Sequence, residues 1–239
     1  MDHVLAWSLL IALAGGLVRG TTGFGAAMVM TPPLALLVGA RTAVPVTLLL
    51  ETFAAAPMLP AAFALARWRV IAPICAAAVL AVPAGGLLLA LASPLTLRRL
   101  IAGTVILFSL ALLSGRQYKG AQRLPTSVGL GALSGTMLGA TSIGAPPVIL
   151  YLLSGPDPVQ ITRANLTLYV VVISAAGLVM LVVSGLLTAA TLQQAALLAL
   201  PFAAGVIAGS RLFARFSDKR FRQLTMVLMF LVSLGVLLA

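Results

Sequence analysis

The stretch GGLVRGTTGFGAAMVMTPP at residues 15–33 decides the fold, and GLGALSGTMLGATSIGAPP at residues 129–147 repeats its plan. Each combines closely spaced small residues, a hydroxyl cluster and a Pro-Pro pair that leads into another apolar run. The two pairs, Pro32-Pro33 and Pro146-Pro147, lie about half a chain length apart. Glycine costs about 1 kcal/mol in a helix interior and proline about 3 kcal/mol. Both stretches therefore predict interrupted helices in two related halves of the chain.

The composition places these interruptions in a membrane. Of the 239 residues, 62% are hydrophobic and 8% are charged, whereas a soluble chain carries roughly 25% charged residues. Apolar runs of about 15 residues or more separate short basic breaks, which is typical of spanning helices, and the alternation of a membrane barrel is absent. We predict an all-α integral membrane protein with about 8–10 membrane segments.

The interrupted stretches indicate where a ligand binds. Non-helical backbone at membrane depth is tolerated only where it is buried in protein or lines a cavity. Gly/Pro-interrupted segments at matching positions of two halves are typical of a transporter's binding site. We therefore expect the site at the two stretches.

The predicted organisation is a single transmembrane domain made of two inverted repeats, residues 1–115 and 125–239, joined by a cytoplasmic linker at 116–124. Each repeat holds a broken or re-entrant helix pair followed by three transmembrane helices. Whether the broken pair crosses the membrane or re-enters stays open. The pairs cover residues 3–38 and 126–154, and the spans lie near 42–65, 70–92, 100–114, 164–185, 190–210 and 223–239.

Charge predicts the orientation. Either form of the broken pair gives each repeat an odd number of crossings, so the basic loops alternate between the two sides. Three basic residues, Arg41, Arg98 and Arg99, then share one side, and a larger group shares the other: Arg67, Arg69, Arg116, Lys119, Arg123, Arg163, Arg211, Arg215, Lys219, Arg220 and Arg222. The positive-inside rule places the larger group in the cytoplasm and both termini in the periplasm. Loops of this kind explain the net charge of +11 better than nucleic-acid binding does.

Helix ends supply the expected chemistry. A helix that begins within the membrane presents unpaired N–H groups and a partial positive charge at its N-terminus, which suits an oxyanion. Helices that open near Gly25 and Gly144 are expected to converge on one anion. The predicted contacts are the backbone of the glycines and the hydroxyls of both stretches, namely Gly23, Gly25, Gly139, Gly144, Thr21, Thr22, Thr141 and Ser142. The alternative is that these small residues only let membrane helices pack closely.

Three further side chains are candidates. Arg19 adjoins the first stretch and is predicted to bind a sulfonate or carboxylate bidentately; the alternative is an arginine that snorkels to the interface. Glu51 lies deep within a predicted span and is predicted to couple transport to protons; the alternatives are an ion pair with Arg19 or Arg163, or a cap on a broken helix. Asn165 is predicted to donate to the substrate, with helix-to-helix hydrogen bonding as the alternative.

Enzyme chemistry is not expected. The only histidine, His3, lies near the terminus, and no cluster of His, Cys or acidic residues suits a metal. No phosphate- or dinucleotide-binding motif precedes a suitable helix. We therefore predict no catalytic residue, no metal and no cofactor. A channel stays open as an alternative, because paired half-helices also build pores.

Two motifs resemble a known family. GTTGFG at residues 20–25, followed by a Pro-started apolar run, resembles the first-repeat motif of the sulfite exporter TauE/SafE family of membrane permeases. GAPPVILYL at residues 144–152 resembles the second-repeat motif of that family. The resemblance covers the whole chain, including its length and duplicated organisation.

The resemblance implies transport of a small anion, and we predict a secondary transporter that works by alternating access around the paired motifs. The implied substrates are organosulfonates or sulfur oxyanions such as sulfite, sulfoacetate or isethionate, and the alternatives are an anion channel or a carrier of small organic carboxylates. The expected partners are the anion, membrane lipid, protons or Na⁺ as coupling ion, and a second copy of the chain in a homodimer. Arginine exceeds lysine 13 to 2, which favours a high-GC bacterium and hence its inner membrane.

Overall fold

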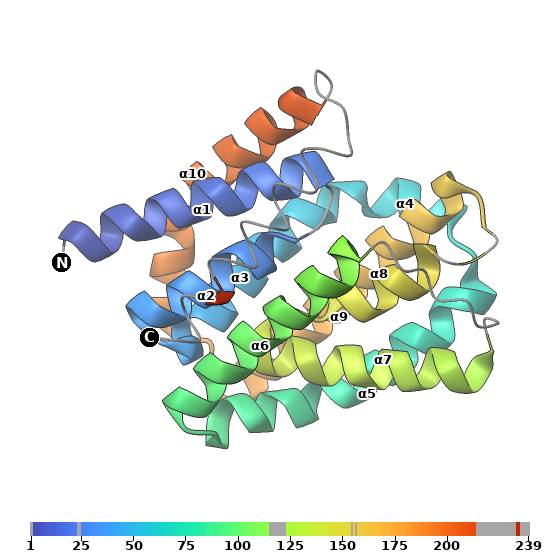
Figure 1. Ribbon diagram of the computed structural model, residues 1–239, viewed down its shortest axis with the longest axis horizontal. Helices are drawn as coiled ribbons and strands as arrows, with labels where there is room; N and C mark the ends of the chain where they lie inside the picture. Colours follow the sequence, from blue (N-terminus) through green and yellow to red (C-terminus); the bar gives the residue numbers. More distant parts are fainter. Residues whose placement is uncertain are drawn as a thin grey trace.

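The computed structural model describes residues 2–22, 25–114, 123–153, 155, 157–213 and 233–234, and every regular element in these ranges is helical (Figure 1). The first half contains α1 (Asp2–Thr22), α2 (Ala26–Val38), α3 (Ala40–Ala55), the 3-10 helix η1 (Ala56–Met58), α4 (Leu59–Leu65), α5 (Trp68–Leu91) and α6 (Pro94–Leu113). The second half contains α7 (Leu124–Thr141), α8 (Ala145–Leu153), α9 (Val159–Val183) and α10 (Ala189–Phe213).

The described helices form an integral membrane protein, which confirms the predicted all-α class. Five of them, α1, α5, α6, α9 and α10, are long and apolar enough to cross a membrane, and α2 is a shorter apolar helix. Large apolar side chains point away from the core; Leu80 is 82% exposed and Leu200 is 79% exposed. Such a surface suits lipid, because lipid tails are as apolar as leucine.

Both predicted interruptions are present. Helix α1 ends at Thr22 and α2 begins after Gly25, whose φ of 88° suits glycine. Helix α7 ends at Thr141, and Ser142 follows with a φ of 60°. Among the described residues, Ser142 is the only non-glycine residue in the left-handed region. A serine held there stores strain of about 1 kcal/mol or more, which is common at functional sites.

Three helix boundaries of the first half correspond to boundaries of the second half that lie 119 residues later in the sequence. The end of α1 corresponds to the end of α7 (22 to 141), and the starts of α2 and α3 correspond to those of α8 and α9 (26 to 145 and 40 to 159). The Pro-Pro pairs do not follow this shift. Pro146 and Pro147 lie in the first turn of α8, where a missing N–H costs nothing, whereas Pro32 and Pro33 lie further inside α2.

Two sequence-based boundaries differ from the structure. The span expected near 42–65 is divided into α3 and α4 by η1, which contains Pro57. Helix α6 begins at Pro94 rather than near residue 100, because proline suits a first turn and the Ser93 hydroxyl accepts a hydrogen bond from the Thr96 N–H at 3.1 Å. The span expected at 223–239, apart from residues 233–234, and most of the linker at 116–124 lie outside the described residues.

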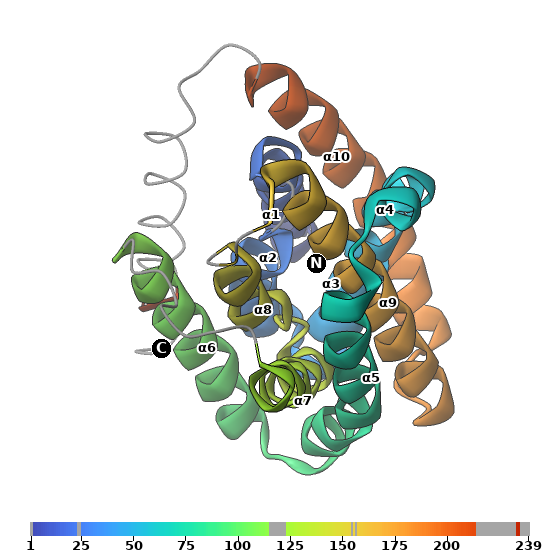
Figure 2. The same ribbon diagram turned by 90° about the vertical axis from the view of Figure 1, so that its right-hand side faces the viewer.

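The long helices pack in two close pairs, α1 with α10 and α5 with α7. A Cβ atom on Gly16 of α1 would overlap the carbonyl oxygen of Phe202 in α10, and one on Gly135 of α7 would overlap that of Ala78 in α5. Each pair joins a helix of one half to a helix of the other. Figure 2 shows α2 and α8 in the middle of the molecule, with α1 and α10 on one side and α5 and α7 on the other.

Candidate functional site

A small cavity, partly open to solvent, lies where the two helix breaks meet. Both halves contribute to its wall, and the two breaks are joined directly, because the hydroxyls of Thr31 in α2 and Ser142 form a buried hydrogen bond of 2.7 Å. The residues that line the cavity are Arg19, Gly25, Ala27, Met28, Glu51, Leu138, Ser142, Ile143, Gly144, Ala145, Pro146, Ile149, Val170, Ile173 and Ser174.

The first break is filled by a carboxylate of the protein itself. Glu51 is 7% exposed, and its Oε1 accepts a hydrogen bond of 3.0 Å from the N–H of Ala27. Ala27 is the second residue of α2, so the negative charge lies at the positive end of that helix. This geometry corresponds to the capping role, one of the three interpretations of Glu51 that the sequence leaves open.

Arg19 places a positive charge in the same cavity. It lies in the last turn of α1 and is 7% exposed. Within the described part of the chain, its side chain has no hydrogen bond, and no salt bridge within 4.0 Å joins it to Glu51. Its positive charge interacts electrostatically with the Glu51 carboxylate, but its five N–H donors make no hydrogen bond among the described residues. Arg19 is therefore available to a ligand.

At the second break, buried hydroxyl groups form hydrogen bonds with the backbone, including the carbonyl oxygen of Gly144. The Tyr169 hydroxyl of α9 donates to Ser134 Oγ of α7, and Ser134 donates to the carbonyl oxygen of Gly144. Thr141 Oγ1 accepts a hydrogen bond of 3.2 Å from the N–H of Ile143. All three hydroxyl side chains are buried. This chain of neutral groups fixes the backbone before α8 without placing a charge there.

The N–H groups at the start of α8 are left free by this arrangement. The hydrogen bonds of the described residues include no acceptor for the N–H of Gly144 or of Ala145. Pro146 and Pro147 follow and have no N–H. Two adjacent backbone donors thus line the cavity together with Arg19. Donors at a helix N-terminus favour an anion.

The structure brings five of the sequence-predicted residues to this cavity: Arg19, Gly25, Glu51, Ser142 and Gly144. Thr21 and Thr141 instead donate to backbone carbonyls of their own helices, at Leu17 and Met137 among others. Gly139 packs against α5, where a Cβ would overlap the carbonyl of Val82. Gly23 and the side chain of Thr22 lie outside what the structure describes.

Asn165 lies in a different contact. Its Oδ1 accepts a hydrogen bond of 2.7 Å from the N–H of Arg67, just before α5, and the Arg67 guanidinium pairs with Asp157. These contacts join the turn between α4 and α5 to the start of α9. The Nδ2 atom of Asn165 is buried and has no partner among the described residues, so its role toward a substrate stays a prediction.

Sequence reasoning missed the contribution of α9. Val170, Ile173 and Ser174 line the cavity from this helix, and Ser174 is 1% exposed. In the described hydrogen bonds the Ser174 hydroxyl has no partner. The signal in the sequence is weak, because a single hydroxyl within the apolar run VVVISAAGLV resembles an ordinary packing serine.

The fold and the cavity together define a multi-pass membrane protein with a buried cation and free helix N–H groups between two broken helices. Sequence comparison gives its family: the sulfite exporter TauE/SafE family matches residues 8–236. The chain belongs to that family, as its motifs indicate, and is therefore a membrane transporter rather than an enzyme. No curated protein and no solved structure gives a significant match.

Proposed function

We propose that this chain is a secondary transporter that binds one small anion at the start of α8, between the free N–H groups of Gly144 and Ala145 and the guanidinium of Arg19. The observation that carries the proposal is Arg19, a buried arginine that lines the cavity and has no hydrogen-bonding partner among the described residues. An oxyanion would satisfy the arginine and the two backbone donors at once. Charge-assisted hydrogen bonds of this kind are about twice as strong as neutral ones.

Sulfonates and sulfur oxyanions fit this donor set, and the family points to the same substrates. Their oxygens can accept bonds from a planar guanidinium and from backbone N–H groups at the same time. Small organic carboxylates present the same charge with one oxygen fewer than a sulfonate. They are therefore the competing substrate class.

The helix pairing supports an alternating-access mechanism with inverted repeats. In both halves the first helix packs on a helix of the other half, α1 on α10 and α7 on α5. Helix bounds related by a single shift agree with a duplicated architecture, and such folds typically rock one bundle against the other around a central site. In this proposal the membrane is the bacterial inner membrane, and both termini face the periplasm.

Glu51 is proposed to couple anion movement to protons. It lines the same cavity as Arg19 and lies within the apolar interior of the protein, where carboxylates often form part of proton pathways. Taking up a proton would remove the negative charge that opposes an incoming anion. Sodium is the alternative coupling ion, and a homodimer stays a prediction.

The direct test is a binding and flux experiment on purified protein. Thermal shift with sulfite, methanesulfonate and acetate should show stabilisation of about 2.7 kcal/mol when a ligand is present at 100 times its Kd. The shift should vanish in Arg19→Ala and persist in Arg99→Ala, because Arg99 is exposed. In liposomes, uptake should saturate with anion concentration and respond to an imposed proton gradient.

Two results would contradict the proposal. Stabilisation by the same anions in Arg19→Ala would place the site elsewhere. A non-saturating current that follows the anion gradient, with no response to protons or Na⁺, would identify a channel instead of a carrier.

A further inference from the structure

The two sides of the cavity differ at equivalent positions. Arg19 and Leu138 each lie three residues before the last residue of α1 and α7. Glu51 and Val170 each lie eleven residues after the first residue of α3 and α9. All four line the cavity. The charged pair of the first half is thus replaced by an apolar pair in the second half.

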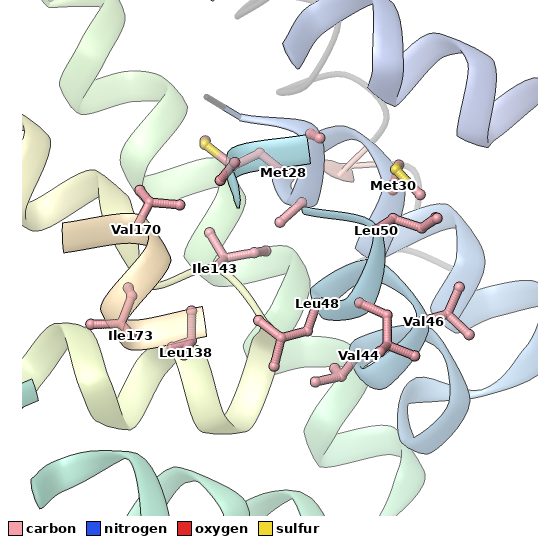
Figure 3. Close-up of a cluster of buried hydrophobic side chains, with 14 of the residues drawn as sticks. Met28, Met30, Val44, Val46, Leu48, Leu50, Leu138, Ile143, Val170 and Ile173 are labelled. Carbon is pink, nitrogen blue, oxygen red and sulfur yellow. The ribbon is translucent and has the colours of Figure 1, made fainter. Parts of the chain in front are cut away.

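The second side forms a mainly apolar wall, to which Ser174 of α9 contributes one hydroxyl. Leu138, Ile143, Ile149, Val170 and Ile173 are each 7% exposed or less and all line the cavity. Figure 3 shows Leu138, Ile143, Val170 and Ile173 gathered where α7, α9 and the segment before α8 meet. A charged or strongly polar group placed against this wall would lose its water and gain no partner of opposite charge.

The charges in the cavity limit the charge of the ligand. Arg19 and Glu51 are the ionisable residues among the described residues that line it. With both charged, a monoanion leaves one net negative charge in the cavity and a dianion leaves two. With Glu51 protonated, a monoanion brings the cavity to neutrality and a dianion does not. A single negative charge is favoured in both cases, because like charges at short range repel strongly in a poorly solvated site.

We propose that the ligand of this site is an oxyanion with one charge and a compact apolar group of about one to three carbons. Its head lies at the N–H groups of Gly144 and Ala145 and at Arg19, and its apolar group lies against Val170 and Ile173. Alkanesulfonates and short alkanoates share this chemistry. The inference rests on the anion site proposed above and narrows its substrate class, because sulfoacetate and isethionate carry a second polar group.

The first test compares ligands of matched length on the full-length protein in nanodiscs. Ethanesulfonate, isethionate and sulfoacetate differ only at the far carbon, which is a methyl group, a hydroxymethyl group or a carboxylate. We expect Kd to rise by about tenfold from ethanesulfonate to isethionate and by at least another tenfold to sulfoacetate. Propionate serves as the carboxylate of matched length, and its Kd relative to ethanesulfonate distinguishes the two head groups.

The second test changes the wall. Val170→Thr and Ile173→Thr each place a hydroxyl in it, and Val170→Thr keeps the side-chain shape. Each should reduce the preference for ethanesulfonate over isethionate by about tenfold. Val182→Thr is the matched control on the same helix, because Val182 is 60% exposed and should not alter the preference. The two wall variants are independent, so one that fails to fold does not prevent the test.

The outcomes separate this inference from the proposed function. If sulfoacetate or isethionate binds as tightly as ethanesulfonate and Arg19→Ala removes binding of all three, the substrate class is wrong and the anion site stands. The inference is likewise overturned if folded Val170→Thr and Ile173→Thr leave the preference unchanged. If no anion depends on Arg19, the proposed function itself falls.

Discussion

The break between α1 and α2 and the break between α7 and α8 share their backbone plan and differ in what stabilises them. At the first, Glu51 accepts a hydrogen bond from Ala27, so the helix N-terminus already holds a negative charge. At the second, Tyr169 and Ser134 support the carbonyl oxygen of Gly144, and the N–H groups of Gly144 and Ala145 have no acceptor among the described residues. The comparison teaches that a duplicated framework can carry one asymmetric site instead of two equal ones.

The two halves also contribute different chemical groups to the cavity. The first half contributes the two charged side chains that line the cavity among the described residues, Arg19 and Glu51, whereas the second half contributes neutral donors and the apolar wall. The Thr31–Ser142 hydrogen bond joins the two breaks, so a change at one is expected to reach the other. The four predictions below alter one side at a time.

The largest effect should come from disrupting the packing of α7, the helix that ends at the second break, against α5. Gly135→Leu places a side chain where α7 meets the backbone of Ala78, and overpacking against backbone cannot be relieved by a rotamer change. We expect loss of more than about 3 kcal/mol of stability, seen as aggregation or a lower Tm in size-exclusion and thermal-melt measurements. Gly129→Leu is the control on the same helix, because nothing lies within 4 Å of its Cβ position. Equal melting of the two variants would contradict the close packing.

The second prediction concerns the cation of the first break. Arg19→Lys keeps the charge and removes the planar fork, so affinity for a sulfonate should fall about tenfold, against about 100-fold for Arg19→Ala. Isothermal titration with methanesulfonate measures both. If lysine restores full affinity, the guanidinium acts only as a point charge and the bidentate geometry is wrong.

The third prediction concerns Glu51, whose negative charge distinguishes the first break from the second. Glu51→Gln keeps an acceptor for the Ala27 N–H and removes the negative charge, so anion affinity should rise about tenfold while proton-driven flux is lost. Glu51→Val also removes the acceptor and should cost about 1–3 kcal/mol, because a buried N–H is left without a partner. Flux that still follows the proton gradient in Glu51→Gln would rule out the coupling role.

The smallest effect should come from removing the hydrogen bond between Tyr169 and Ser134, which supports the backbone at the second break. Tyr169→Phe removes the donor to Ser134 and should lower stability by about 1 kcal/mol and anion affinity about threefold, because the Gly144 backbone becomes less fixed. Thermal melts and titration measure the two effects. The matched variant Tyr151→Phe removes the 2.7 Å hydrogen bond between Tyr151 and Ser127, and Tyr151 does not line the cavity. It should therefore change stability and leave affinity near wild type.

The sequence was sufficient to predict the long helices α5, α6, α9 and α10 and the two breaks, and it singled out Arg19 and Glu51, which line the cavity. These features depend on local rules, since glycine, proline and a charge within an apolar run each have a strong preference. The two Pro-Pro pairs do not occupy equivalent positions in the two halves, so they do not indicate how the helices of the halves align. A proline is tolerated both in a first turn and, where neighbouring groups compensate for the lost hydrogen bond, deeper in a membrane helix.

Other features depend on the fold and could not be read locally. Thr21 and Thr141 belong to the predicted hydroxyl clusters, yet a threonine in a helix readily donates to a carbonyl one turn back, and the sequence does not decide between this bond and a ligand. The apolar wall from α9 consists of residues that resemble any lipid-facing or core residue. Only the packing of α9 beside the second break gives Val170 and Ile173 their position.

The pairing of α1 with α10 has a consequence for how the protein is made. Helix α1 leaves the ribosome before α10, whose backbone covers Gly16 and Gly20 and which begins only at residue 189. At ordinary rates of synthesis α1 waits in the bilayer on the order of ten seconds or more with this glycine face uncovered. A chain truncated before α10 would leave that face uncovered permanently, so α1 cannot complete its packing until α10 has been synthesised.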